Sequence, residues 1–251
     1  MRQPTRTHAA VSLAAILLLA VTATAAAETD EWARFRGPNG SGIAESPALP
    51  DRFGPSTNVV WKADLPAGHS SPVLSSTRIF LTAAENGELV TIALDRATGD
   101  ILWRRASPRP REEPLDPRNN PAAPSPAVGA EAVFVFFADF GLISYDHDGK
   151  ERWRVPLGPF DNLYGMGASP VLVGDLVILV CDQNTGSFMI ALDRVSGDTV
   201  WRVERPEAHS SHSTPVLWES PDGQSQLLVP GSFLLDAYDP STGEKIWWVR
   251  G

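Results

Sequence analysis

Short runs of β-branched and other apolar residues, each ended by glycine, proline, asparagine or aspartate, follow one another through most of the chain. One group of such runs lies at residues 70–74, 78–83, 89–94 and 101–105, and similar runs return at 177–181, 188–192 and 199–203. Runs of this length between turn formers are typical of β-strands. No stretch after residue 27 keeps apolar residues at helical spacing, so the pattern predicts sheets of short strands.

A phrase that ends in tryptophan repeats along the chain. It reads DRATGDILW at 95–103, DRVSGDTVW at 193–201 and DPSTGEKIW at 239–247, with a form one residue shorter, DHDGKERW, at 146–153. A second phrase, Ser-Pro or Thr-Pro before alanine or valine, starts at residues 71, 125, 169 and 214. Periods of about 40 to 50 residues are typical of propellers, solenoids or arrays. Four antiparallel strands in each period predict a propeller blade.

The repeated tryptophans and glycines have a structural interpretation. One large aromatic residue per blade buries apolar surface between blades, and glycine in a Thr-Gly or Ser-Gly pair supplies the positive φ of a hairpin. The aspartates of these turns are interpreted as acceptors of backbone N–H groups rather than as catalytic acids. The structural positions are Trp61, Trp103, Trp153, Trp201 and Trp247, with Gly99, Gly197 and Gly243.

The repeats divide the chain into predicted parts. Four blades are expected at about 70–106, 124–156, 168–204 and 213–250, after an extended N-terminal segment at 28–57. Residues 58–65 also have the pattern of an outermost strand, although the three inner strands of its blade are not found in the sequence. We therefore expect an arc with separated ends, whose uncovered apolar face favours association or poor solubility.

The first 27 residues have the features of a signal peptide. Arg2 and Arg6 precede an apolar stretch at 9–21, and three alanines at 25–27 satisfy the small-residue rule, which predicts cleavage after Ala27. The stretch is shorter than the roughly 20 residues of a membrane-spanning helix. A permanent anchor is the alternative interpretation. Cleavage would place the protein in the periplasm or outside the cell, with no membrane span.

Composition narrows the classes of partner. The 251 residues contain 21 Lys and Arg against 30 Asp and Glu, a net charge of -9, and 43% are hydrophobic. An acidic chain without a dense basic cluster is a poor ligand for nucleic acid phosphates. The only cysteine, Cys181, lies in an apolar run and is expected to be buried and inert, so an exported chain would fold without an internal disulfide.

The Thr-Gly-Asp/Glu-x-x-Trp phrase resembles the repeat of pyrroloquinoline-quinone (PQQ) type β-propellers. WARFRGPNG at 32–40, NVVWK at 58–62 and SSPV at 70–73 look like the corresponding segments of exported PQQ-like propeller proteins of bacteria. The resemblance implies an all-β propeller of about eight blades, in which the tryptophan of each outermost strand docks on the neighbouring blade. Such propellers include quinoprotein dehydrogenases and the propeller lipoprotein of the outer-membrane β-barrel assembly machine.

The resemblance leaves two functions open. One is a non-enzymatic binding or scaffold module that presents its face to an envelope protein or another exported partner, with no cofactor. The other is a quinoprotein dehydrogenase that oxidises an alcohol or sugar with PQQ and Ca²⁺, or a fragment of such an enzyme. The family's alcohol dehydrogenases typically use adjacent disulfide-bonded cysteines beside PQQ, a pair that one cysteine cannot form. Ca²⁺ would also need converging oxygen ligands, and no matching set is found. The sequence therefore favours the binding module.

Candidate contact residues lie where one blade is expected to cross to the next. His69, His209 and His212 are in Ser-rich crossings, and Asn162 and Tyr164 are in the glycine-containing crossing DNLYGMG at 161–167. The glycines would let backbone approach a ligand or partner closely. His209 and His212 could ligate a metal, but the sequence names no further ligand. The alternative interpretation is that these residues only hold the loops. The proline-rich insertion at 107–123 is expected to be solvated.

Overall fold

The described residues of the computed structural model, 32–44 and 50–251, fold into sheets. The predicted signal peptide lies outside these residues. Four antiparallel sheets of four strands follow one another along the chain, and within each sheet the strands lie side by side in chain order. The strands are β1 (Val73–Leu74), β2 (Arg78–Glu85), β3 (Glu88–Asp95), β4 (Ile101–Ser107), β5 (Ala127–Val128), β6 (Ala132–Phe137), β7 (Gly141–Asp146), β8 (Glu151–Pro156), β9 (Val171–Val173), β10 (Leu176–Cys181), β11 (Phe188–Asp193), β12 (Thr199–Glu204), β13 (Val216–Glu219), β14 (Ser225–Gly231), β15 (Leu234–Tyr238) and β16 (Lys245–Arg250).

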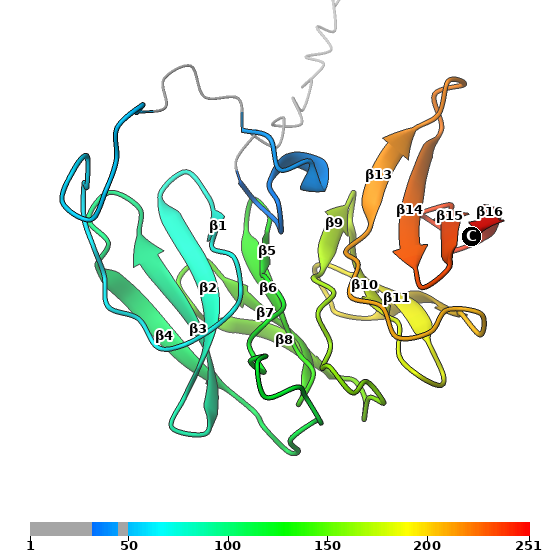
Figure 1. Cartoon of the computed structure of the whole chain (residues 1–251), viewed down its shortest axis with the longest axis horizontal. Coiled ribbons are helices and arrows are strands. Elements are labelled where there is room, and N and C mark those ends of the chain that lie inside the picture. Colours follow the sequence, from blue (N-terminus) through cyan, green and yellow to red (C-terminus); the bar gives the residue numbers. More distant parts are fainter. Residues whose placement is uncertain (1–31, 45–49) are drawn as a thin grey trace, which may run out of the picture.

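The sheets are arranged as the blades of a propeller. Figure 1 shows the first sheet at one end of the row and the fourth at the other, with the second and third between them. The predicted all-β fold is confirmed. The one helix described is the 3-10 turn η1 (Pro38–Gly40), and no helix among the described residues is long and apolar enough to cross a membrane.

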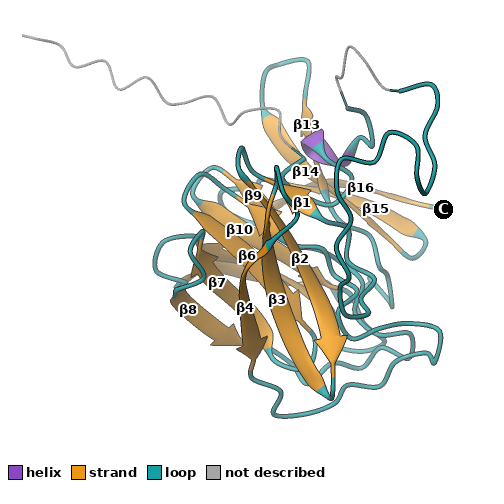
Figure 2. Cartoon of the chain, turned by 90° about the vertical axis from the view of Figure 1, so that its left-hand side faces the viewer, coloured by secondary structure: helices purple, strands orange, loops and turns teal. Residues whose placement is uncertain are grey.

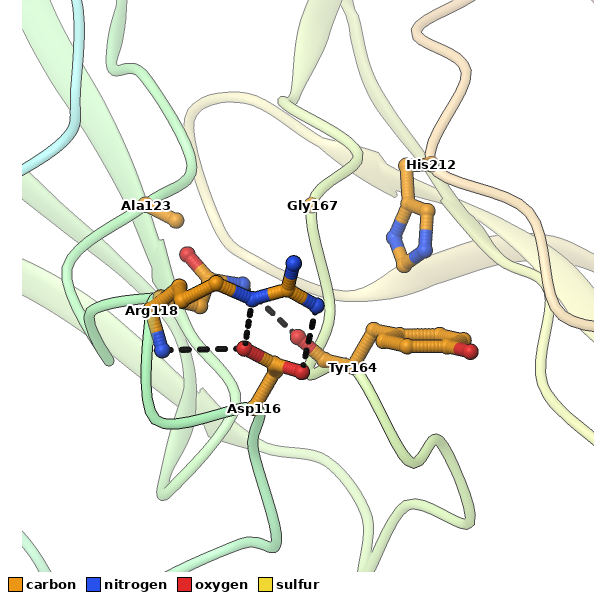
Figure 3. Close-up of a pocket in the computed structure, with 7 residues that line it drawn as sticks. Asp116, Arg118, Ala123, Tyr164, Gly167 and His212 are labelled. Carbon is orange, nitrogen blue, oxygen red and sulfur yellow. Dashed lines mark hydrogen bonds and ion pairs between the residues drawn. The ribbon is translucent and has the colours of Figure 1, made fainter.

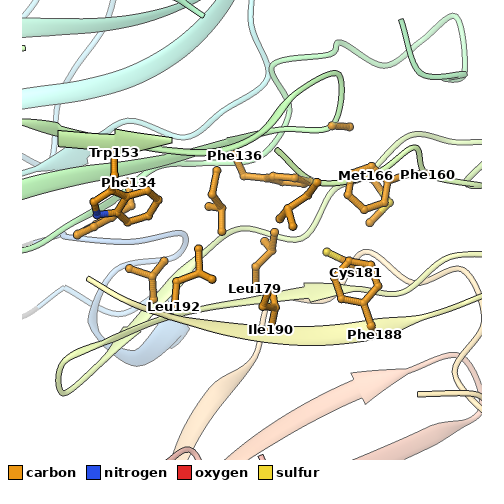
Figure 4. Packing of buried hydrophobic residues seen from close by; sticks show 14 of the residues in the cluster. Phe134, Phe136, Trp153, Phe160, Met166, Leu179, Cys181, Phe188, Ile190 and Leu192 are labelled. Atoms are coloured by element: carbon orange, nitrogen blue, oxygen red, sulfur yellow. The ribbon is translucent and has the colours of Figure 1, made fainter. Parts of the chain in front are cut away.

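The core lies between neighbouring sheets rather than within one. Side chains of β6 are buried on both faces, because the even positions face one neighbouring sheet and the odd positions face the other. Figure 4 shows the layer between the second and third sheets, where Phe134, Phe136 and Trp153 pack against Leu179 and Ile190. Equivalent layers join the first sheet to the second and the third to the fourth.

The tryptophans connect each blade to the next. The indole of Trp153 lies against Gly197, whose φ is 80°, and its Nε1 donates to the Arg194 carbonyl at 3.2 Å. A Cβ at Gly197 would lie 2.8 Å from the ring, so the contact requires glycine. The same ring-on-glycine contact joins Trp61 to Gly99, Trp103 to Gly149 and Trp201 to Gly243. The indole of Trp247 instead donates to Gln226 of its own sheet.

The Ser-Pro and Thr-Pro phrases form a second connection between blades. The Ser71 N–H donates to the Ser125 hydroxyl at 2.8 Å, and the Ser125 N–H donates to the Ser169 hydroxyl at 2.9 Å. The Ser169 N–H in turn donates to Thr214 Oγ1 at 3.0 Å. This chain of bonds explains why a hydroxyl residue repeats at the start of each inner strand.

The expected outermost strand at 58–65 does not form. These residues pair with no strand of the described chain, and the only nearby bridge joins Gly54 to Thr57. Strand pairing needs a neighbouring strand, and the described ranges 32–44 and 50–251 place no strand beside this segment. The segment is held instead through Trp61, whose Nε1 donates to the Arg96 carbonyl at 3.0 Å.

The meander gives the row of sheets two faces. One, here called the crossing face, carries the segments 64–72, 108–126, 157–170 and 205–215 that lead into the four inner strands, with the loops β2–β3, β6–β7, β10–β11 and β14–β15. The other, the turn face, carries the Asp-x-x-Thr-Gly turns. Figure 2 shows the first sheet in front and the turn η1 close to β13.

Candidate functional site

A pocket of about 370 Å³ lies on the crossing face, between segments that are distant in sequence. Figure 3 shows that Tyr164 and His212 lie on one side of it and the ion pair of Asp116 and Arg118 on the other. Asn119, Ala123 and Gly167 complete the lining. Two of the five predicted contact residues, Tyr164 and His212, therefore share one site.

The acidic side of the pocket is neutralised by its neighbour. The carboxylate of Asp116 accepts from Arg118 Nε at 2.8 Å, from Nη2 at 2.9 Å and from the backbone N–H at 2.9 Å. These bonds lower the pKa of Asp116 to about 2. Asp116 is thus ionised and fully engaged, which makes it unsuited to accept a proton in catalysis.

The aromatic side of the pocket is open to solvent. Tyr164 is 50% exposed and meets the His212 ring edge-on, with the ring centroids 6.3 Å apart. His212 packs on Gly167, where a Cβ would lie 3.1 Å from the His212 Cβ. Glycine at 167 therefore makes room for the imidazole beside the aromatic ring.

The other predicted contact residues hold the surrounding loops or lie outside the pocket. Asn162 is buried, donates to the Asp182 carbonyl at 3.3 Å and accepts from the Tyr164 N–H at 3.1 Å. His69 Nδ1 lies 3.4 Å from Asn119 Oδ1. His209 is exposed and does not line the pocket. No group of three or more His, Cys, Asp or Glu side chains in the described ranges could hold a metal ion.

The proline-rich insertion at 107–123 is packed against the blades, so the expectation that it is simply solvated is wrong. Arg109 Nε donates to Asp139 Oδ2 at 2.7 Å. Arg111 donates to the Ala138 carbonyl at 2.6 Å, and Ala122 is fully buried. Asn119 Nδ2 reaches the Tyr164 carbonyl at 2.7 Å. The proline-rich composition predicted an exposed loop, but hydrogen bonds from the two arginines and Asn119 to distant residues hold the insertion against the blades.

A buried charged cluster that the sequence did not reveal joins the third and fourth sheets. Arg205, fully buried, donates to Asp182 at 2.8 Å, to Asp236 at 2.8 Å and to the Tyr238 hydroxyl at 2.6 Å. Burial raises the pKa of Asp182 although the guanidinium opposes this. The cluster is closed to solvent and therefore has a structural role. An Arg-Pro pair directly after an outer strand was its only sequence signal.

The residues present do not match a PQQ site with Ca²⁺. Cys181, at the end of β10, is buried between the second and third sheets, and burial raises the pKa of its thiol well above the usual value. The pocket beside Tyr164 and His212 offers one carboxylate, that of Asp116, which Arg118 already occupies. Calcium needs six or more oxygen ligands, roughly, and the described crossing-face residues bring no comparable set together.

Repeated four-stranded sheets with docked tryptophans define a β-propeller of PQQ-type repeats. Comparison with family models agrees, because the model described as "Outer membrane protein assembly factor BamB" matches residues 54–163 and 92–249. The chain belongs to this family.

Similar proteins support the family and the fold. Outer membrane protein assembly factor BamB of Kangiella koreensis is 25% identical over 183 residues, which are 70% of this chain and 42% of that protein. The chain thus spans less than half the length of this relative. The crystal structure of BamB from Moraxella catarrhalis is similar with a TM-score of 0.56 and 17% identity, over 77% of this chain and 55% of that one.

A quinohemoprotein alcohol dehydrogenase from Comamonas testosteroni is also similar, with a TM-score of 0.56 and 13% identity, over 90% of this chain and 50% of that one. At these identities the structural likeness concerns the fold alone. Assembly factors and dehydrogenases share this fold, so the function must be argued from the site.

Proposed function

We propose that the protein is an exported, non-enzymatic binding module of the cell envelope and that the crossing face receives a protein partner. The observation that carries this proposal is a set of exposed apolar side chains on that face. Phe233 is 82% exposed, Leu163 66% and Tyr164 50%. Phe233 belongs to the β14–β15 loop, which bonds to the neighbouring crossing through Ser232 and the Ser210 carbonyl at 2.6 Å.

Exposed apolar groups on an ordered loop are suited to recognition. The Asn162 side chain accepts from the Tyr164 N–H through Oδ1 at 3.1 Å, and the Gly165 N–H donates to the Asn162 backbone carbonyl at 3.1 Å. These two bonds to a buried residue hold the loop that carries Leu163 and Tyr164. Binding of a partner would then cost little free energy for ordering this loop. Tyrosine and arginine are enriched among residues that dominate binding energy, and Tyr164 and Arg118 stand on opposite sides of the pocket.

Family membership supports the class of partner. Relatives of this chain are named for the assembly of outer membrane proteins. An envelope protein in the periplasm is therefore the partner we propose, which agrees with the predicted signal peptide.

The dehydrogenase is the weaker candidate because the pocket carries no carboxylate cluster and no cysteine pair. We propose that no PQQ is used. The purified chain is expected to show no Ca²⁺-dependent, saturable PQQ binding and no electron transfer from alcohols to a dye. Stoichiometric Ca²⁺-dependent binding with alcohol oxidation would reverse the choice.

Affinity capture from an envelope extract tests the binding module. The wild-type chain is compared with the double variant Leu163→Ser and Tyr164→Ala, and with Val195→Ser as the control. Val195 is 62% exposed in an Asp-x-x-Ser-Gly turn on the opposite face. A partner retained by the wild type and the control but lost by the double variant supports the proposal. A partner retained equally by all three chains places the contact elsewhere.

A further inference from the structure

Each of the first three sheets uses a tryptophan of its outermost strand to bind the next sheet. The Nε1 atoms of Trp103, Trp153 and Trp201 donate to backbone carbonyls of the next sheet's turn at 2.8, 3.2 and 3.0 Å. All three rings are buried and lie on a glycine of that turn. The same contact is therefore made at each of the three junctions between sheets of the described chain.

Trp247 has the corresponding position in the fourth sheet but makes a different bond. Its indole donates to the Gln226 side chain of its own sheet at 2.7 Å and stays half-buried. Val249, two residues further on, is 57% exposed, whereas the equivalent Val155 and Val203 pack into the layer with the following sheet. No fifth sheet lies against the fourth among the described residues.

The face of the fourth sheet that bears Trp247, here called its outer face, is apolar. The register places Leu228 and Ala237 in line with Trp247, and Leu235 beside Val249. The alternate residues of β14 and β15 form the core layer with the third sheet. An apolar sheet face that the described chain leaves uncovered indicates an interaction surface.

The first sheet carries a surface of complementary kind, on the face turned away from the second sheet. Residues 58–65, here called the strap, cover this face in place of a sheet, and they pair with no strand of the described chain. A pocket of about 320 Å³ remains between the strap and the sheet. The aliphatic side chains of this face come from β2 and β3, and they are Ile79, Leu81, Val90, Ile92 and Leu94.

Trp61 of the strap occupies the place where the first sheet can receive a tryptophan. Its ring lies on Gly99, and its Nε1 donates to the Arg96 carbonyl at 3.0 Å, as in the three junctions between sheets. The first and fourth sheets stand at opposite ends of the row (Figure 1), so Trp247 and Gly99 of one chain lie apart. A second copy of the chain can bring these two residues together.

We propose that a second copy of this chain covers the outer face of the fourth sheet with its first sheet, and that Trp247 replaces the second copy's Trp61 on Gly99. The contact continues the interface that the chain already makes three times, with an indole on a glycine and its Nε1 on a turn carbonyl. It buries the aliphatic residues of both faces. Each copy offers one face of each kind, so the contact can be made twice in a closed pair.

This surface is separate from the crossing-face pocket, and its test does not require the partner proposed above. Light scattering after size exclusion of the full chain, over a range of concentrations, measures the association. The wild type is expected to reach twice the monomer mass. Val249→Lys is expected to weaken the association by roughly tenfold or more, because the new charge would lose its hydration on burial.

Val200→Lys is the matched control, because Val200 is 51% exposed in β12, the outermost strand of the third sheet. It should associate as the wild type does. Trp61→Ala is expected to raise the association constant roughly fivefold, because no ring must first leave Gly99. An unchanged association constant in Trp61→Ala would overturn the exchange of tryptophans.

Crosslinking tests the direction of the contact. Chains with Val249→Cys are mixed with chains with Thr98→Cys, next to Gly99, and treated with a short bismaleimide, while the native Cys181 is buried. A crosslinked pair is expected in the mixture and in neither variant alone. The proposal is overturned by a chain that stays monomeric at every concentration, or by equal association of Val249→Lys and Val200→Lys. Crosslinking of Val249→Cys alone would also overturn it, because the two fourth sheets would then face each other.

Discussion

The contact between Trp153 and Gly197 gives a sharp test of how the blades are joined. Gly197→Ala places a Cβ 2.8 Å from the indole at a φ of 80°. A non-glycine residue in the left-handed region costs about 1–2 kcal/mol. The new methyl group also displaces a ring that is 8% exposed and weakens its bond to the Arg194 carbonyl at 3.2 Å. A lost hydrogen bond costs about 1 kcal/mol, and strained packing costs a further 1–3 kcal/mol, roughly.

The matched control is Gly87→Ala, where φ is 81° and no atom lies within 4 Å of the new Cβ. The control has the backbone cost alone, about 1–2 kcal/mol. Urea unfolding followed by far-ultraviolet circular dichroism compares the two variants. Gly197→Ala is expected to lose about 2–4 kcal/mol more than Gly87→Ala, from the lost bond and the displaced ring. Equal losses in the two variants would refute the role of the tryptophan contact.

Three further predictions concern stability. Ser125→Ala removes the acceptor of the Ser71 N–H and should lower the free energy of unfolding by about 1–3 kcal/mol; an unchanged urea midpoint would contradict the hydroxyl connection between blades. Arg205→Met leaves Asp182 buried without its partner and should cost about 3–5 kcal/mol, part of which the second change Asp182→Asn should restore in thermal unfolding. Burial lowers the pKa of His147, so the unfolded chain takes up the proton first and stability should fall as pH drops below about 6.5; an equal pH slope in His147→Gln would argue against this residue.

The sequence was sufficient to predict the sheets, because each strand and turn is marked by the residues within it. The repeat of tryptophan and glycine indicated four blades, and the described residues form four sheets of four strands. The strand expected at 58–65 was wrong because pairing depends on neighbours, which a local pattern does not contain. Trp61 still docks on Gly99, so the tryptophan contact forms although the backbone around it does not pair as a strand.

The candidate site was less accessible to sequence reasoning. Tyr164 and His212 belong to repeated crossings, and their loops could be placed on one face from the meander alone. Asp116 and Arg118 come from an insertion without a repeat, and their position depends on pairings such as Arg109 with Asp139 that span 30 residues. Arg205 was missed for the same reason, since its acceptors Asp182, directly after β10, and Asp236, in β15, lie far from it in the sequence.

Photo-crosslinking in cells is the most direct test of the central claim, which is that the crossing face binds a protein partner. A photoreactive amino acid is placed at Leu163 on the crossing face or at Val195 on the turn face, two positions with similar exposure of 66% and 62%. The account predicts a discrete crosslinked envelope protein from position 163 and none of that species from position 195. The same species from position 195 alone, or from neither position, would contradict the claim.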